Sequence, residues 1–194
     1  FDTTASCLIN YRGWPVHHAH ECFGQVGAVY NMMFNRDDMI HSAVNFQGCG
    51  LPIEKKREIA KEVWGGEDAI DEDKNYTPMN EHKAKFCWWS IVTDVLHDSL
   101  TLCNWVWPMT MSPSKSRDYR GDLDLEAKFY KAVTGEDITT EELYKRGAAI
   151  MTLQRANTVR GMKTNDFRGV HDTITEWPFT KDPDIQPFTA GTDK

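Results

Sequence analysis

One apolar segment, from Thr77 to Leu96, constrains the fold of this chain most. Thr77 suits the N-cap of a helix and Pro78 suits the first helical position, so the pair predicts a helix start. The large apolar residues that follow are Phe86, Trp88, Trp89, Ile91, Val92, Val95 and Leu96. They occupy more than one face of a helix, which indicates that this helix is buried on more than one side.

Further helices are predicted around this segment, because apolar residues recur at spacings of three and four over residues 24–34, 53–64, 122–133 and 141–160. Gly65 and Gly66 are expected to end the second of these helices. Thr139 and Glu142 have the spacing of a capping box, which predicts the start of the last one.

The connections between the predicted helices are polar. Residues 67–76 are acidic and predict a solvated connection, and they lack the Gly and Glu offsets of a calcium-binding loop. After Gly161 the helical periodicity stops, and residues 163–194 contain several Gly and Pro breakers. No stretch shows convincing strand-like alternation. The sequence therefore predicts an all-α, irregular multi-helix domain with a long C-terminal extended tail, spanning residues 1–194. In the helix over 122–133, the side chains expected to face inward are Leu125, Phe129 and Ala132.

Composition limits the classes of function. The formal net charge of -7 argues against sequence-independent binding of nucleic acid, which requires a basic face. No run approaches the roughly 18 apolar residues of a membrane span. The five cysteines are odd in number, no Cys-x-x-Cys occurs, and no secretory signal is recognised, so we expect a reducing, cytoplasmic setting.

The most informative short stretch is residues 98–103, Asp-Ser-Leu-Thr-Leu-Cys, which follows the apolar helix. In a structural interpretation, Asp98 ends or caps the helix and Cys103 is a small core residue. In a functional interpretation, the Asp98 carboxylate holds a polar organic ligand and the Cys103 thiol ligates a metal or cluster. These six residues alone favour the structural interpretation.

Several histidines invite a functional interpretation as well. His41 could line a pocket as a proton donor or acceptor, although a core or capping histidine is the commoner case. Four residues of metal-ligating types cluster near the N-terminus: His17, His18, His20 and Cys22. They suggest a zinc site, but their spacing is more typical of loop residues whose side chains hydrogen-bond to the backbone.

Three motifs in a fixed order resemble the C-terminal domain of the tungsten-containing aldehyde ferredoxin oxidoreductases. Residues 30–41 resemble that family's helix, Arg and short turn ending in His. Residues 98–103 resemble its D-x-x-G-L-C element. Residues 133–143, Val-Thr-Gly-Glu-Asp-Ile-Thr-Thr-Glu-Glu-Leu, resemble its TG-D-(S/T)-x-EEL stretch. The matching positions that follow this stretch are Gly147, Leu153, Arg155, Asn157, Arg160 and Gly161.

The resemblance implies roles for particular residues. Cys103 would be the fourth ligand of a [4Fe–4S] cluster. Asp98, with Thr101 and Leu102, would hold a pterin of a tungsten (or molybdenum) bis-pterin cofactor. His41 would lie by the metal and assist substrate binding or proton transfer. The implied reaction is oxidation of an aldehyde, or a related carbonyl compound, to a carboxylic acid. The electrons would leave through the cluster to ferredoxin or an iron–sulfur electron-transfer subunit.

Two departures from the family pattern qualify these expectations. Thr101 stands where the family has Gly, which predicts a different local backbone if positive φ is required there. The other three cluster cysteines and the pterin-binding β domain are not in this sequence, so we expect an N-terminal pterin- and cluster-binding portion of the same enzyme as a partner. The alternative hypothesis is a cofactor-free all-α interaction domain derived from such an enzyme.

Overall fold

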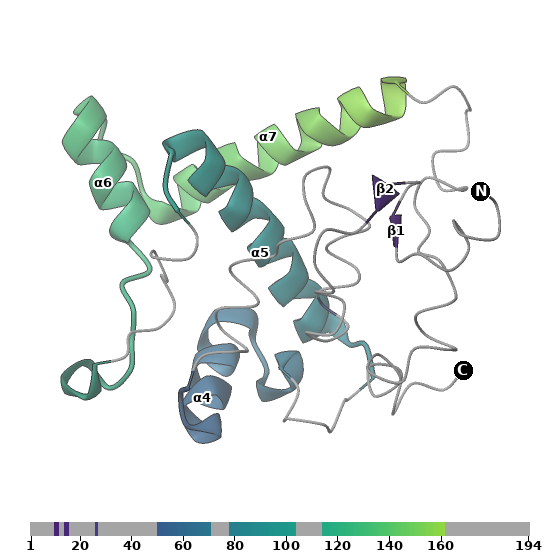
Figure 1. Ribbon diagram of the computed structural model, residues 1–194. Helices are drawn as coiled ribbons and strands as arrows, with labels where there is room; N and C mark the ends of the chain where they lie inside the picture. The colour runs from purple at the N-terminus through teal and green to yellow at the C-terminus, as the bar shows by residue number, and fades with distance from the viewer. Residues whose placement is uncertain are drawn as a thin grey trace.

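The computed structural model of the protein describes residues 10–11, 14–15, 26, 50–70, 78–103 and 114–161 (Figure 1). Its helices are α4 (Ile53–Trp64), α5 (Glu81–Leu100), α6 (Leu125–Thr134) and α7 (Thr140–Gly161), with short 3-10 turns η2 (Glu67–Ala69) and η3 (Lys115–Arg117). One antiparallel pair of two-residue strands, β1 (Asn10–Tyr11) and β2 (Trp14–Pro15), accompanies them. This helical content confirms the predicted all-α class. None of the described helices is long and apolar enough to cross a membrane.

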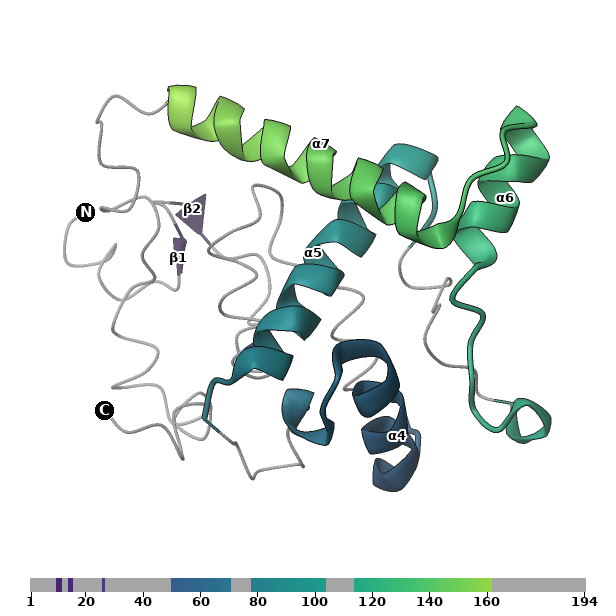
Figure 2. The same ribbon diagram turned by 180° about the vertical axis from the view of Figure 1, so that it is seen from behind.

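Helix α5 lies at the centre of the described helices. Figures 1 and 2 show α7 crossing it near its C-terminal end, with α4 beside its lower part and α6 next to the start of α7. Eleven of its residues are buried, from Lys83 to His97. Phe86, Ile91 and Val95 belong to one apolar cluster, and Val92 and Leu96 belong to a second one. The predicted burial of this helix on more than one side is therefore confirmed.

The predicted start of α5 at Thr77 and Pro78 is wrong, because the N-cap is Asn80. Its side-chain oxygen accepts a hydrogen bond from the backbone N–H of Lys83 at 2.8 Å. Its side-chain nitrogen also donates to the backbone oxygen of Asp68 at 3.0 Å. An amide can cap the helix and bond the preceding turn at once, whereas a threonine hydroxyl three residues earlier cannot.

The first cluster joins α4, η2 and α5. The rings of Trp64 and Phe86 stack with their centroids 3.9 Å apart, and Trp89 meets Trp64 edge-on at 5.6 Å. Helix α4 has the predicted bounds and ends at Gly65, whose φ of 90° requires glycine. Ala69 and Ile70 are buried in the same cluster, so the acidic segment was wrongly predicted as solvated at this end.

The inward face predicted for α6 is also wrong. Phe129 is 47% exposed, Ala132 is exposed and Leu125 is only half-buried, while Glu126 and Ala127 are buried. The helix starts at Leu125 instead of residue 122. The buried face is set by a contact of Glu126 with α5 and by the packing of Ala127 and Tyr130 in the second cluster. Apolar spacing alone could not reveal a carboxylate on the inward face.

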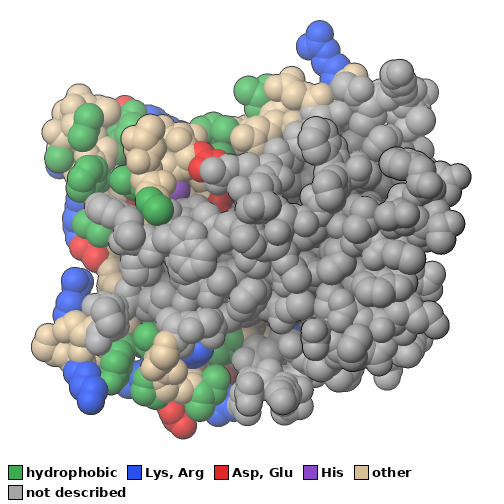
Figure 3. All heavy atoms as spheres, in the orientation of Figure 1, with side chains coloured by type: hydrophobic (Ala, Val, Ile, Leu, Met, Phe, Trp, Pro, Cys, Tyr) green, Lys and Arg blue, Asp and Glu red, His purple; other side chains and the backbone are tan. Residues whose placement is uncertain are grey.

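Helices α5 and α7 meet at a buried glycine. A Cβ atom on Gly147 would lie 2.6 Å from Cγ of Leu96, closer than real Cβ atoms approach, and 3.0 Å from Cγ1 of Val92, which is also a tight contact. The absence of a side chain therefore permits this close crossing. On the face seen in Figure 3, the described Lys and Arg side chains (blue) and the described Asp and Glu side chains (red) are interspersed.

Candidate functional site

The C-terminal end of α5 is closed by a left-handed turn at Thr101, which has φ 58° and ψ 32°. The N–H of Thr101 donates to the carbonyl oxygen of Asp98 at 3.3 Å, and the N–H of Leu102 donates to that of His97 at 2.8 Å. These two bonds form a Schellman motif, in which glycine usually occupies the left-handed position. The chain thus takes the positive φ that glycine favours, although a β-branched residue stands there.

Thr101 is therefore expected to store conformational strain. Replacing Thr101 by glycine should stabilise the protein by about 1 kcal/mol. A left-handed non-glycine residue costs roughly 1–2 kcal/mol, and the larger unfolded-state entropy of glycine cancels part of the gain from relieving this cost. Thermal unfolding should show a rise in Tm of about 3 °C. Thr101→Ala is the matched control, since it removes the branched side chain but keeps Cβ. An equal rise in both variants would contradict a backbone origin.

Two groups on either side of this turn reach the surface. Asp98 lies in the last turn of α5 and is exposed, and Cys103 is exposed directly after the turn. Leu102 between them is half-buried, while Thr101 is exposed. Asp98 is at a helix end, as predicted, but the interpretation of Cys103 as a small core residue is wrong. An exposed carboxylate and an exposed thiol near one helix end are accessible to a ligand outside this part of the chain.

The second cysteine that the structure describes behaves differently. Cys87 is buried in the middle of α5, and burial raises the pKa of its thiol to about 12. A buried neutral thiol is a small apolar group and a poor ligand, because metals and electrophiles react with the thiolate. The remaining cysteines lie outside the described residues; they are Cys7, Cys22 and Cys49.

This contrast predicts different reactivities in the native, metal-free chain. With the three other cysteines changed to serine, iodoacetamide should modify Cys103 more than about tenfold faster than Cys87, because thiolate fraction and access govern the rate. Mass spectrometry of tryptic peptides measures both rates. Addition of denaturant should bring the Cys87 rate up to that of Cys103. Similar rates in the native chain would show that Cys103 is covered.

The described residues can supply one ligand to a metal centre, but they do not form a complete centre. Among them, no group of three or more His, Cys, Asp or Glu side chains is arranged to hold a metal ion. Cys103 could supply a single thiolate to a cluster whose other ligands lie elsewhere, and its exposure fits that role. His41 lies outside the described residues, as does the predicted zinc group of His17, His18, His20 and Cys22.

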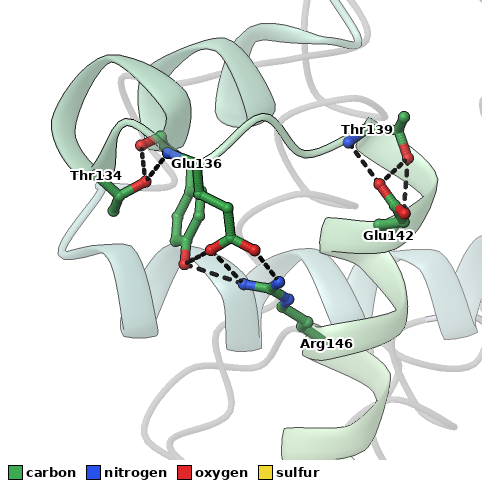
Figure 4. A network of polar contacts seen from close by, with 6 residues as sticks. Thr134, Glu136, Thr139, Glu142 and Arg146 are labelled. Carbon is green, nitrogen blue, oxygen red and sulfur yellow. Dashed lines mark hydrogen bonds and ion pairs between the residues drawn. The ribbon is translucent and has the colours of Figure 1, made fainter.

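The motif at residues 133–143 forms the connection between α6 and α7. Gly135, with φ 77°, ends α6, and Glu136 forms an ion pair with Arg146 that also includes the Tyr130 hydroxyl (Figure 4). The Arg146 guanidinium and the Tyr130 hydroxyl hold the pKa of Glu136 below its usual value.

The same connection also contains the predicted capping box. The hydroxyl of Thr139 accepts from the N–H of Glu142 at 3.2 Å, and the N–H of Thr139 donates to the Glu142 carboxylate at 2.9 Å (Figure 4). The capping-box prediction is therefore confirmed. This backbone N–H, followed by the Thr139 hydroxyl, lowers the pKa of the Glu142 carboxyl. The hydrogen bonds within this motif are structural: they end one helix, begin the next and tie the connection to α7 through Arg146.

A second polar group, formed by His97 and Glu126, lies between α5 and α6. Nε2 of His97 lies 2.8 Å from Oε1 of Glu126, and both side chains are almost fully buried, with 2% and 5% exposure. Buried Thr93 lies one turn before His97 on α5. The only signal in the sequence is that Thr93, Asp94 and His97 interrupt an otherwise apolar run.

A known protein family matches most of this chain. The family model described as aldehyde ferredoxin oxidoreductase, domains 2 & 3, matches residues 26–194. That range begins at the buried Val26 and includes all four described helices. No solved structure matches the chain. Since the match covers most of the sequence, the chain belongs to the aldehyde ferredoxin oxidoreductase family.

Proposed function

We propose that this chain is the C-terminal, all-α part of an oxidoreductase that converts an aldehyde, or a related carbonyl compound, to a carboxylic acid. The overall change consumes one aldehyde and one water and releases two protons and two electrons. The family to which the chain belongs is a tungsten-pterin and iron–sulfur family. The tungsten (or molybdenum) bis-pterin group, when bound, supplies the two-electron chemistry, and a [4Fe–4S] cluster passes the electrons on to ferredoxin or a similar acceptor.

The single observation that supports this proposal is the surface position of Asp98 and Cys103 at one end of α5. An ionised Asp98 is a suitable acceptor for the N–H donors of a pterin. The thiolate of Cys103 would ligate an iron of the cluster. Asp98 and Cys103 are five residues apart, on either side of the turn through Thr101 and Leu102. The same short segment would therefore contact both the pterin and the cluster.

The remaining roles rest on the family resemblance. His41 would hold or move a proton near the substrate, because imidazole exchanges protons near neutral pH. Three further thiolates and the second part of the pterin site would come from an N-terminal portion of the same enzyme, which is the principal partner proposed here. The chain would work in the cytoplasm, where thiols stay reduced.

Metal analysis of the native enzyme tests this function. Protein purified without oxygen from its own cells should contain about one tungsten or molybdenum and about four irons per chain, the content of one metal centre and one cubane cluster. It should also reduce a ferredoxin or a viologen dye when an aldehyde is added. Protein that carries neither metal nor iron under these conditions would support the alternative of a cofactor-free interaction domain.

A further inference from the structure

A cavity of about 600 Å³ lies between α4, α5, α6 and α7. This volume falls in the range of small-molecule sites, which are concave, mostly apolar and equipped with few polar groups. Its walls include the aromatic side chains of Trp88, Trp89 and Tyr144. Trp88 is 41% exposed, so part of this aromatic wall is open to solvent.

The polar part of the cavity consists of Thr93, His97 and Glu126. Oε1 of Glu126 is bonded to His97, but Oε2 of Glu126 and Oγ1 of Thr93 are buried and have no hydrogen-bond partner among the described residues. A buried polar atom without a partner costs roughly 1–3 kcal/mol, and more if it is charged. Oε2 of an ionised Glu126 can only accept, and the Thr93 hydroxyl can accept or donate, so a ligand with N–H donors would satisfy both atoms.

The charge around the cavity selects the sign of that ligand. Most charged side chains of the lining already have partners: Glu62 pairs with Arg120 at 2.8 Å, Glu141 with Lys145 at 2.8 Å and Lys85 with Glu81 at 2.6 Å. Asp124 accepts a hydrogen bond from the hydroxyl of Thr140. The buried Oε2 of Glu126 has no partner among the described residues, so this carboxylate oxygen is what favours a cation in the cavity. The described residues contain no group of three side chains suited to a metal ion, and an aromatic wall suits an organic cation instead.

We propose that this cavity binds a small organic ammonium compound with an aromatic or apolar body. The ammonium group donates hydrogen bonds to Oε2 of Glu126 and Oγ1 of Thr93. The apolar body lies against Trp88, Trp89 and Tyr144. This site reaches His97, one residue before Asp98, but it requires neither metal nor cluster, so its test and that of the redox function can fail independently.

Calorimetric titration of the full chain compares two probes of nearly equal shape, 2-phenylethylammonium and the neutral 2-phenylethanol. The ammonium compound should bind at least about tenfold more tightly, because a hydrogen bond to a charged group contributes about 1.5–3 kcal/mol. Equal affinities, or no binding of the ammonium compound, would overturn the proposal.

Three variants locate the contact. Thr93→Val should weaken ammonium binding severalfold without lowering Tm, because the hydroxyl it removes has no partner among the described residues. Glu126→Gln should weaken it about tenfold or more. Glu54→Gln removes an exposed carboxylate of α4 outside the cavity and should leave the affinity unchanged. If Glu126→Gln does not fold, Thr93→Val decides: wild-type affinity in that variant would contradict the site.

Discussion

Gly147→Val is expected to lower the free energy of unfolding by roughly 3 kcal/mol, the upper part of the range for overpacked cores. The first added carbon would lie 2.6 Å from Leu96, and the two further methyl groups would have to displace Val92 or Leu96. Both of these residues are buried in the second apolar cluster, so the two helices would have to move apart. For a chain of this size the loss corresponds to a fall in Tm of about 9 °C.

A matched variant separates this clash from the low helix propensity of valine. Ala149→Val places the same side chain two residues later on α7, at an exposed position. It should cost only a few tenths of a kcal/mol through helix propensity. Gly147→Ala should fall between the two, because its gain of about 1 kcal/mol in helix propensity offsets part of the clash. Equal melting temperatures for Gly147→Val and Ala149→Val would show that α7 does not approach α5 this closely.

Cys103→Ser in the whole enzyme is expected to cause the largest change in function. A serine oxygen is a poor replacement for a thiolate ligand of iron, so the cluster should be lost or become labile. Iron content and visible absorption should fall, and aldehyde-dependent reduction of ferredoxin should drop by more than about 100-fold. Removal of outer-shell partners of metal sites alone can cost 10–100-fold.

The control for this variant is Cys87→Ala. It also removes one thiol, but this thiol lies within α5 and is buried and protonated. The variant should lose some stability through a small cavity and keep its iron content. Full retention of iron and activity in Cys103→Ser would contradict the proposed ligand. Equal loss of iron in both variants would point to unfolding instead of loss of a ligand.

Much of the helical framework could be predicted from local sequence signals. The bounds of α4 follow from amphipathic spacing and the Gly65 stop, and the start of α7 follows from the Thr139 and Glu142 capping box. Such signals involve neighbours within one turn, so the chain carries them locally. The family resemblance at residues 133–143 also belongs to this class, because the structure of that connection depends on short-range contacts.

Other features depend on partners distant in sequence and could not be predicted from spacing. The start of α5 was misplaced because Asn80 is fixed by Asp68, twelve residues earlier. The inward face of α6 was misplaced because Glu126 pairs with His97, twenty-nine residues earlier. The exposure of Cys103 has a different origin: it departs from the usual burial of a free cysteine, on which the structural interpretation relies.

The turn at Thr101 also has a mechanical consequence for the proposed function. Its two backbone hydrogen bonds connect Leu102 and Thr101 to the last turn of α5, so the backbone from Asp98 to Leu102 is held to the helix end, directly before Cys103. These bonds join residues no more than five positions apart, so they do not depend on the packing of α7. The crossing of α5 with α7 at Gly147 sets where this segment is located and how it is oriented. A packing variant at the crossing would therefore shift Asp98 and the turn together and leave the hydrogen bonds of the turn intact.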